Sequence, residues 1–124
     1  MDYRILIVDD IYVNRLLLKE IVHKFCSVYF EAQNGKEAIE ILAREEVDVV
    51  LMDIEMPVMN GLETTKYIRK VFSSPKNNIP IIALTAHNPI VFFSDYKNVG
   101  FNQLLTKPYS FDSLLNCIKD VCGK

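Results

Sequence analysis

The sequence predicts an α/β protein built on a doubly wound parallel sheet. Short apolar runs rich in β-branched residues alternate with amphipathic segments along the 124 residues, and this alternation is typical of parallel strands joined by helices. The runs lead into polar residues, as at 49–61, where a valine-rich run reaches Asp53 and a loop with Pro57 follows. We therefore expect five strand–helix units with a polar site at the carboxyl edge of the sheet.

The first strand is expected at Arg4–Val8, because this apolar run leads directly into Asp9 and Asp10. A helix is expected over 11–26, where apolar residues recur at four-residue intervals. The residues expected on its buried side are Val13, Leu17, Ile21 and Phe25.

The later elements continue the alternation of strands and helices. Further strands are expected at Val28–Ala32, Asp48–Asp53, Ile79–Leu84 and Gln103–Leu105. Further helices are expected over 36–46, over 62–72, from Pro89 to Gly100, and over 111–121. Turn and cap residues separate these segments, including Asn34-Gly35, Ser74-Pro75 and Asn88-Pro89. The residues expected to face inward are Ala38, Ile39, Leu42 and Ala43; Leu62, Thr65, Ile68 and Phe72; Phe93 and Val99; and Leu114, Leu115, Ile118 and Val121.

The composition favours one cytoplasmic domain over residues 1–124. Half of the residues are hydrophobic, and a net charge of −2 without a basic run argues against nucleic-acid binding by this domain alone. The sequence has no signal-peptide pattern and no apolar run of about 20 residues, so we expect no membrane association. Cys26, Cys117 and Cys122 lack metal-site spacing, which favours reduced, mostly buried thiols.

Four strand ends bring acids, a hydroxyl and a cation to one edge of the sheet. These residues are Asp9 and Asp10, Asp53, Thr85 and Lys107. Neighbouring carboxylates repel one another unless a cation lies between them, and carboxylate, carbonyl and water oxygens suit Mg²⁺. Asp53 can then attack phosphorus to form an acyl phosphate, with Mg²⁺ and Lys107 balancing the phosphoryl charge and Thr85 donating its hydroxyl.

The acids in LIVDD, the acid in LMDIEMPVMNG, the hydroxyl in ALTA and the lysine in TKP form one set. In this order and spacing, over essentially the whole chain, the set resembles the response-regulator receiver domains of the CheY-like family. The resemblance implies a flavodoxin-like (βα)5 fold with strand order 2-1-3-4-5. It also implies a switch in a two-component phosphorelay that catalyses only its own phosphorylation and dephosphorylation.

The resemblance further implies a role for each site residue. Asp53 would accept a phosphoryl group from a histidine kinase or histidine phosphotransfer protein, and Thr85 would move towards that group. Asp10 and Asp53 would ligate Mg²⁺ with the backbone carbonyl of Glu55, and Asp9 would act directly or through water. Mn²⁺ or Ca²⁺ is expected to be able to replace Mg²⁺. The surface of Thr85, the fourth helix and the fifth strand would then control an output partner or domain.

Some positions depart from the family pattern or modify it. Leu104 stands three residues before Lys107, where the family usually has an aromatic switch residue, so we expect apolar repacking or weak coupling there. Glu55 and His87 would flank the phosphoryl group, and we expect them to change its lifetime. The alternative is that both are solvated residues at the rim of the site.

An apolar surface is expected where the fourth helix begins. With Phe93 and Val99 inward, Ile90 and Phe92 would face outward near Leu104, and exposed apolar patches often mark partner sites. This surface would bind an output partner or, on phosphorylation, a second copy of the chain. The alternative is a rotated or distorted helix that buries these side chains.

Two other functions share part of this residue set. A Mg²⁺-dependent phosphohydrolase could use Asp53 as nucleophile and Glu55 as general acid, but such enzymes carry the nucleophile on the first strand and have a cap or a larger substrate pocket. A degenerate receiver would only bind proteins, but the acids, hydroxyl and lysine are all present here. Both a stand-alone regulator and a receiver within a hybrid kinase or longer regulator fit the sequence.

Overall fold

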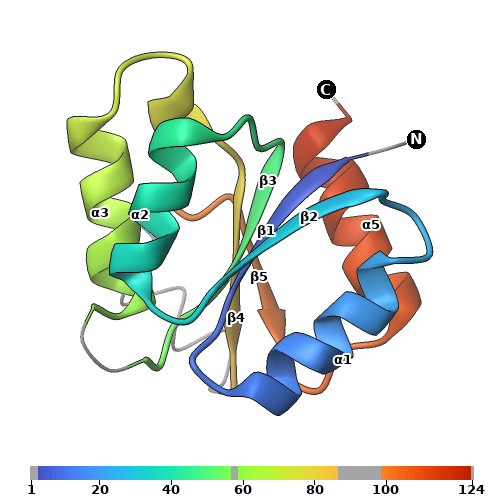
Figure 1. Ribbon diagram of the computed structural model, residues 1–124. Helices are drawn as coiled ribbons and strands as arrows, with labels where there is room; N and C mark the ends of the chain where they lie inside the picture. Colours follow the sequence, from blue (N-terminus) through green and yellow to red (C-terminus); the bar gives the residue numbers. More distant parts are fainter. Residues whose placement is uncertain (1–2, 57–58, 87–98, 124) are drawn as a thin grey trace.

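The computed structural model describes residues 3–56, 59–86 and 99–123. In these ranges a five-stranded parallel sheet has helices on both faces, which confirms the predicted fold class (Figure 1). The strand order is β2-β1-β3-β4-β5, as the family resemblance implies. The strands are β1 (Arg4–Val8), β2 (Val28–Ala32), β3 (Val49–Asp53), β4 (Ile81–Thr85) and β5 (Gln103–Thr106).

Among the described residues, two helices cover each face of the sheet. Helices α1 and α5 lie on one face, and α2 and α3 lie on the other (Figure 1). Their bounds are α1 (Tyr12–Val22), α2 (Gly35–Arg44), α3 (Gly61–Val71) and α5 (Phe111–Cys122), with a 3-10 helix η1 at Lys76–Asn78. The side chains of Asn34, Asn60 and Ser110 accept hydrogen bonds from backbone N–H groups in the first turns of α2, α3 and α5. These caps fix where the three helices begin.

Part of the predicted fourth helix falls on residues outside the described ranges, as do His87, Ile90, Phe92 and Phe93. Gly100, where this helix is predicted to end, lies within the described residues. It has a φ of 120°, a conformation that favours glycine. No helix in the described ranges combines the length and apolar character needed to cross a bilayer.

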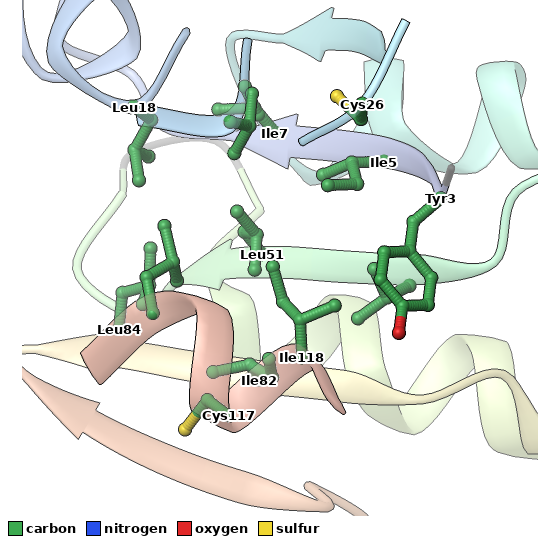
Figure 2. Packing of buried hydrophobic residues seen from close by; sticks show 13 residues of the cluster. Tyr3, Ile5, Ile7, Leu18, Cys26, Leu51, Ile82, Leu84, Cys117 and Ile118 are labelled. Carbon is green, nitrogen blue, oxygen red and sulfur yellow. The ribbon is translucent and has the colours of Figure 1, made fainter. Parts of the chain in front are cut away.

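Among the described residues, the two larger apolar clusters lie between the sheet and its helices, because alternate side chains of each strand point to opposite faces. The cluster towards α1 and α5 includes Ile5, Ile7, Leu18, Leu51, Ile82, Leu84 and Ile118, all fully buried (Figure 2). The cluster towards α2 and α3 includes Leu6, Val8, Leu42, Val50, Met52, Ile68 and Ile81. Burial of each such side chain contributes on the order of 1.5–3 kcal/mol, so the central strands hold the carboxyl edge of the sheet firmly in place.

Helix α1 turns a different face to the core from the predicted one. It spans Tyr12–Val22 rather than 11–26, and Val13 and Leu17, predicted to be inward, are 59% and 57% exposed. The prediction fails because α1 has more apolar residues than one face can bury. In addition, Arg15 lies on the buried face, where it donates hydrogen bonds to Glu31 and to the Asp9 carbonyl. The buried residues of α1 are Arg15, Leu18 and Val22.

The other helices agree better with the predicted faces. Ala43 is wrongly predicted to be inward, because α2 buries Ile41 beside Leu42 instead and ends at Arg44. The residues confirmed as buried are Ala38, Leu42, Thr65, Ile68, Leu114 and Ile118. The residues that are only half-buried are Ile39, Leu62, Phe72, Val99, Leu115 and Val121. All three cysteines are free thiols, and Cys122 is half-buried, which agrees with the prediction.

Candidate functional site

The carboxyl edge of the sheet brings together side chains from four strands. Asp53 and Thr85 are the last residues of β3 and β4, while Asp9 and Lys107 directly follow β1 and β5. The backbone ladder continues past the strand ends, because Asp9 N–H donates to the Ala32 carbonyl at 3.1 Å and Lys107 N–H to the Thr85 carbonyl at 2.8 Å. Parallel pairing thus sets the spacing of the functional side chains.

Three carboxylates form a cluster at this edge, as the sequence predicts. Asp9, Asp10 and Asp53 each offer a carboxylate oxygen, and these three atoms lie within 4.8 Å of one another. Asp9 and Asp53 are almost completely buried. Asp9 Oδ2 and Asp10 Oδ1 are also shielded from solvent, and neither accepts a hydrogen bond from the residues that the structure describes. Because buried carboxylate oxygens without donors are costly, this geometry fits a hard divalent cation.

Lys107 supplies the positive charge at this cluster. Its Nζ donates to Asp53 Oδ1 at 3.0 Å and lies 4.0 Å from Asp9 Oδ2. Burial nevertheless raises the pKa of Asp53 from 3.8 to about 6, and the charge of Asp9 adds to this rise. Lys107 opposes both effects, while Glu55 contributes further repulsion. One lysine therefore does not balance the acidic cluster, which leaves it suited to a second cation.

Glu55 and Thr85 meet across the site. Glu55 lies two residues beyond β3 and is exposed, whereas Thr85 is fully buried. The Thr85 hydroxyl donates to Glu55 Oε2 at 3.1 Å. Glu55 therefore lies beside Thr85 at this edge of the sheet, and the hydrogen bond between them was not predicted.

Arg15 is a site residue that the sequence analysis missed. Its Nη1 donates to the Asp9 carbonyl at 2.8 Å, and its Nε donates to Glu31 Oε1 at 3.1 Å. Lys19 binds the other oxygen of Glu31 at 3.1 Å. Arg15 thus ties α1 and β2 to the backbone of the acidic loop. The spacing of Arg15, Leu18 and Val22 on one helix face was the available signal.

Tyr109 is a second residue that was missed. Burial, followed by the charges of Asp9 and Asp53, raises its pKa well above the ordinary value, so the phenol keeps its proton. Tyr109 also lines a groove of about 440 Å³ between α1 and the segment after β5. The residues lining this groove are Asn14, Leu17, Glu20, Ile21, Lys107, Pro108 and Tyr109.

Leu104 lies on β5 opposite Ala83 and packs, half-buried, against the cluster of Ile54 and Ala83. An aliphatic side chain therefore occupies the position at which the sequence resemblance implies an aromatic residue. The predicted neighbours of Leu104 on the partner surface, Ile90 and Phe92, and the predicted modulating residue His87 lie outside the described residues.

Comparisons with known proteins agree with this geometry. The sequence model of the response regulator receiver domain matches residues 5–119. The chain is 34% identical to sporulation initiation phosphotransferase F of Bacillus subtilis, over 96% of this chain and 93% of that protein. It is also 34% identical to the aerobic respiration control sensor protein ArcB of Escherichia coli, over 93% of this chain but only 14% of that longer protein.

A similar solved structure is the receiver domain of a sensor histidine kinase from Pseudomonas aeruginosa PAO1. It covers the whole of both chains with a TM-score of 0.87 and 27% sequence identity, and it contains a magnesium ion coordinated in its active-site cleft. The fold, the acidic cluster and the family match thus lead to one assignment. The chain belongs to the response regulator receiver domain family, the CheY-like signalling switches of two-component systems.

Proposed function

We propose that residues 1–124 form one receiver domain whose phosphoacceptor is Asp53. The observation that carries this proposal is the buried Asp53 carboxylate, with Lys107 at 3.0 Å and the unsatisfied oxygens of Asp9 and Asp10 beside it. The Asp53 carboxylate, the Lys107 ammonium group and oxygens suited to a metal ion lie together at the carboxyl edge of the sheet. These groups are what phosphoryl transfer to a carboxylate requires.

The chemistry is the attack of an Asp53 carboxylate oxygen on the phosphorus of a donor. A P–O bond forms, the bond from phosphorus to the donor's imidazole nitrogen breaks, and its electron pair returns to the imidazole. Lys107, already held at Asp53 Oδ1, can stabilise the charge of the incoming phosphoryl oxygens. The Thr85 hydroxyl would donate to one of these oxygens.

The acidic cluster would hold Mg²⁺, which would supply positive charge to the phosphoryl oxygens. Asp10 and Asp53 are the proposed carboxylate ligands, Glu55 would contribute its backbone carbonyl, and Asp9 would bind directly or through water. Support comes from the convergent oxygens in this chain and from the magnesium in the similar receiver domain. Oxygen donors of this kind also accept Mn²⁺ or Ca²⁺.

The phosphoryl donor would be a histidine kinase or a histidine phosphotransfer protein. The groove beside α1 supports this proposal, because Lys107, one of its lining residues, also contacts Asp53. Apolar side chains continue along α1, where Tyr12, Val13 and Leu17 are between 57% and 60% exposed. A partner helix packed on this face could bring its phosphohistidine to Asp53.

A trapping experiment tests the identity of the phosphoacceptor. The chain is incubated with Mg²⁺ and acetyl phosphate and then treated with borohydride, which reduces an acyl phosphate to an alcohol. We expect peptide mass spectrometry to find homoserine at Asp53. Homoserine at Asp9 or Asp10 instead, with Asp53 unchanged, would contradict the assignment.

A further inference from the structure

The Thr85 hydroxyl is committed to Glu55 in this structure. Thr85 Oγ1 lies 3.1 Å from Glu55 Oε2, and Thr85 is fully buried at the end of β4. Glu55 is exposed, so its carboxylate reaches inward from the rim of the site to a buried donor. A hydroxyl has a single proton to donate. The hydrogen bond to Glu55 therefore excludes a simultaneous one from Thr85 to a group on Asp53.

We propose that the Glu55 carboxylate is a latch that withholds the Thr85 hydroxyl from the phosphoryl site. This inference rests on the proposed function, because the competing acceptor is a phosphoryl group on Asp53. Glu55 is thus a positioning residue that acts through Thr85. Phosphorylation releases the latch, and the release makes the movement of Thr85 part of the switch.

The charges around the latch explain how a phosphoryl group can open it. Phosphorylation replaces the single negative charge of the ionised Asp53 carboxylate with a phosphoryl group that carries about 1.5 to 2 negative charges, and it offers anionic oxygens to the same donor. Glu55 and Asp53 already repel each other, since Glu55 contributes to the raised pKa of Asp53. A further anion on Asp53 increases this repulsion. The arriving group therefore both competes for Thr85 and pushes Glu55 towards solvent.

The latch also offers an alternative to an aromatic switch residue. On β5, Thr106 is the pairing partner of Thr85, and Leu104 lies two residues before it. Leu104 is aliphatic and has no side-chain hydrogen-bonding group. Leu104 therefore cannot hydrogen-bond to the Thr85 hydroxyl through its side chain, whereas Glu55 does so at 3.1 Å.

A double-mutant cycle tests the latch. The probe is beryllium fluoride with Mg²⁺, a stable mimic of a phosphoryl group on a carboxylate, and its affinity is measured by calorimetry. The proteins are the native chain, Glu55→Ala, Thr85→Val and the double variant. Removing Glu55 relieves charge repulsion in both Thr85 backgrounds, but it releases a hydroxyl only when Thr85 is present. We expect Glu55→Ala to tighten binding roughly two- to tenfold more in the native background than in the Thr85→Val background.

Glu55→Gln is the matched control, because it removes the charge and keeps a hydrogen-bond acceptor. We expect Glu55→Gln to retain part of the latch. The extra tightening of beryllium fluoride binding, native background over Thr85→Val background, should therefore be smaller for Glu55→Gln than for Glu55→Ala. Equal tightening in both backgrounds would overturn the latch and leave charge repulsion alone. No binding to the native chain would instead contradict the proposed function itself.

A second measurement does not need the Thr85→Val substitution at the buried position. The methyl resonance of Thr85 is compared between the native chain and Glu55→Ala, both without beryllium fluoride. We expect Glu55→Ala to move this resonance towards its position in the native chain with beryllium fluoride bound. An unchanged methyl resonance in Glu55→Ala would also overturn the latch.

Discussion

Asp53 is held in a setting that disfavours its charge. Burial and Asp9 raise its pKa from 3.8 to about 6, so between these pH values the folded chain binds more protons than the unfolded chain. In the absence of a divalent cation, the contribution of Asp53 to the free energy of unfolding therefore falls as the pH rises from about 4 to 6, and then stays constant. The proposed phosphoacceptor is thus a residue that destabilises the fold when it is ionised.

Asp53→Asn should consequently stabilise the chain in EDTA. We expect a gain of about 1–3 kcal/mol in the free energy of unfolding at pH 7.5 and a much smaller gain at pH 4, where Asp53 is already protonated. Urea unfolding of both proteins at the two pH values measures this difference. Equal gains at pH 4 and pH 7.5 would show that the charge of Asp53 is not the cause.

Arg15 acts on the acidic cluster through the backbone. Arg15→Met leaves the Asp9 carbonyl without its 2.8 Å donor, and we expect it to cost about 1–3 kcal/mol in stability and to weaken Mg²⁺ binding severalfold. Calorimetric titration with Mg²⁺ measures the affinity. Lys19→Met is the matched control, because it removes the other ion pair of Glu31 without contacting Asp9. An equal loss of Mg²⁺ affinity in both variants would contradict this role for Arg15.

The elements differ in how well the sequence predicts them. Apart from Asp53 at the end of β3, the buried residues of β1 and β3 are all apolar, and such runs are typical of strands covered on both faces. Helix α1 carries apolar residues on several faces, so its periodicity alone does not select one. Its orientation depends on Arg15 reaching Glu31 on β2, and this contact across 16 residues is not a local property of the sequence.

The exposed face of α1 gives an element-scale prediction for the proposed donor interface. Leu17→Asp should slow phosphoryl transfer from a phosphorylated histidine phosphotransfer protein at least severalfold, because it places a charge in the groove beside Lys107. Val71→Asp on α3 is the matched control, since Val71 and Leu17 are 56% and 57% exposed. Transfer is followed by the radioactive phosphoryl group that the receiver gains.

Acetyl phosphate separates docking from chemistry in the same variants. This small donor needs no protein interface, so its reaction with Leu17→Asp should proceed at the native rate. If Leu17→Asp and Val71→Asp transfer from the protein donor equally well, the donor does not use this face of α1.

At the scale of the whole molecule, the site was predictable because its residues lie at strand ends. Parallel strands must bring their carboxyl ends to one edge, so Asp9, Asp53 and Lys107 could be placed together without knowing any distance. The hydrogen bond between Glu55 and Thr85 could not be predicted in this way. It depends on how one side chain turns back across the site after β3, which strand order does not determine.

The central claim is that the whole fold serves one phosphoryl group on Asp53. The most direct measurement is the intact mass of the chain after incubation with Mg²⁺ and acetyl phosphate, compared with the same reaction in EDTA and with Asp53→Asn. We predict a single phosphoryl addition to the native chain that requires both Mg²⁺ and Asp53. No addition under any condition, or an addition that persists in Asp53→Asn, would contradict the account.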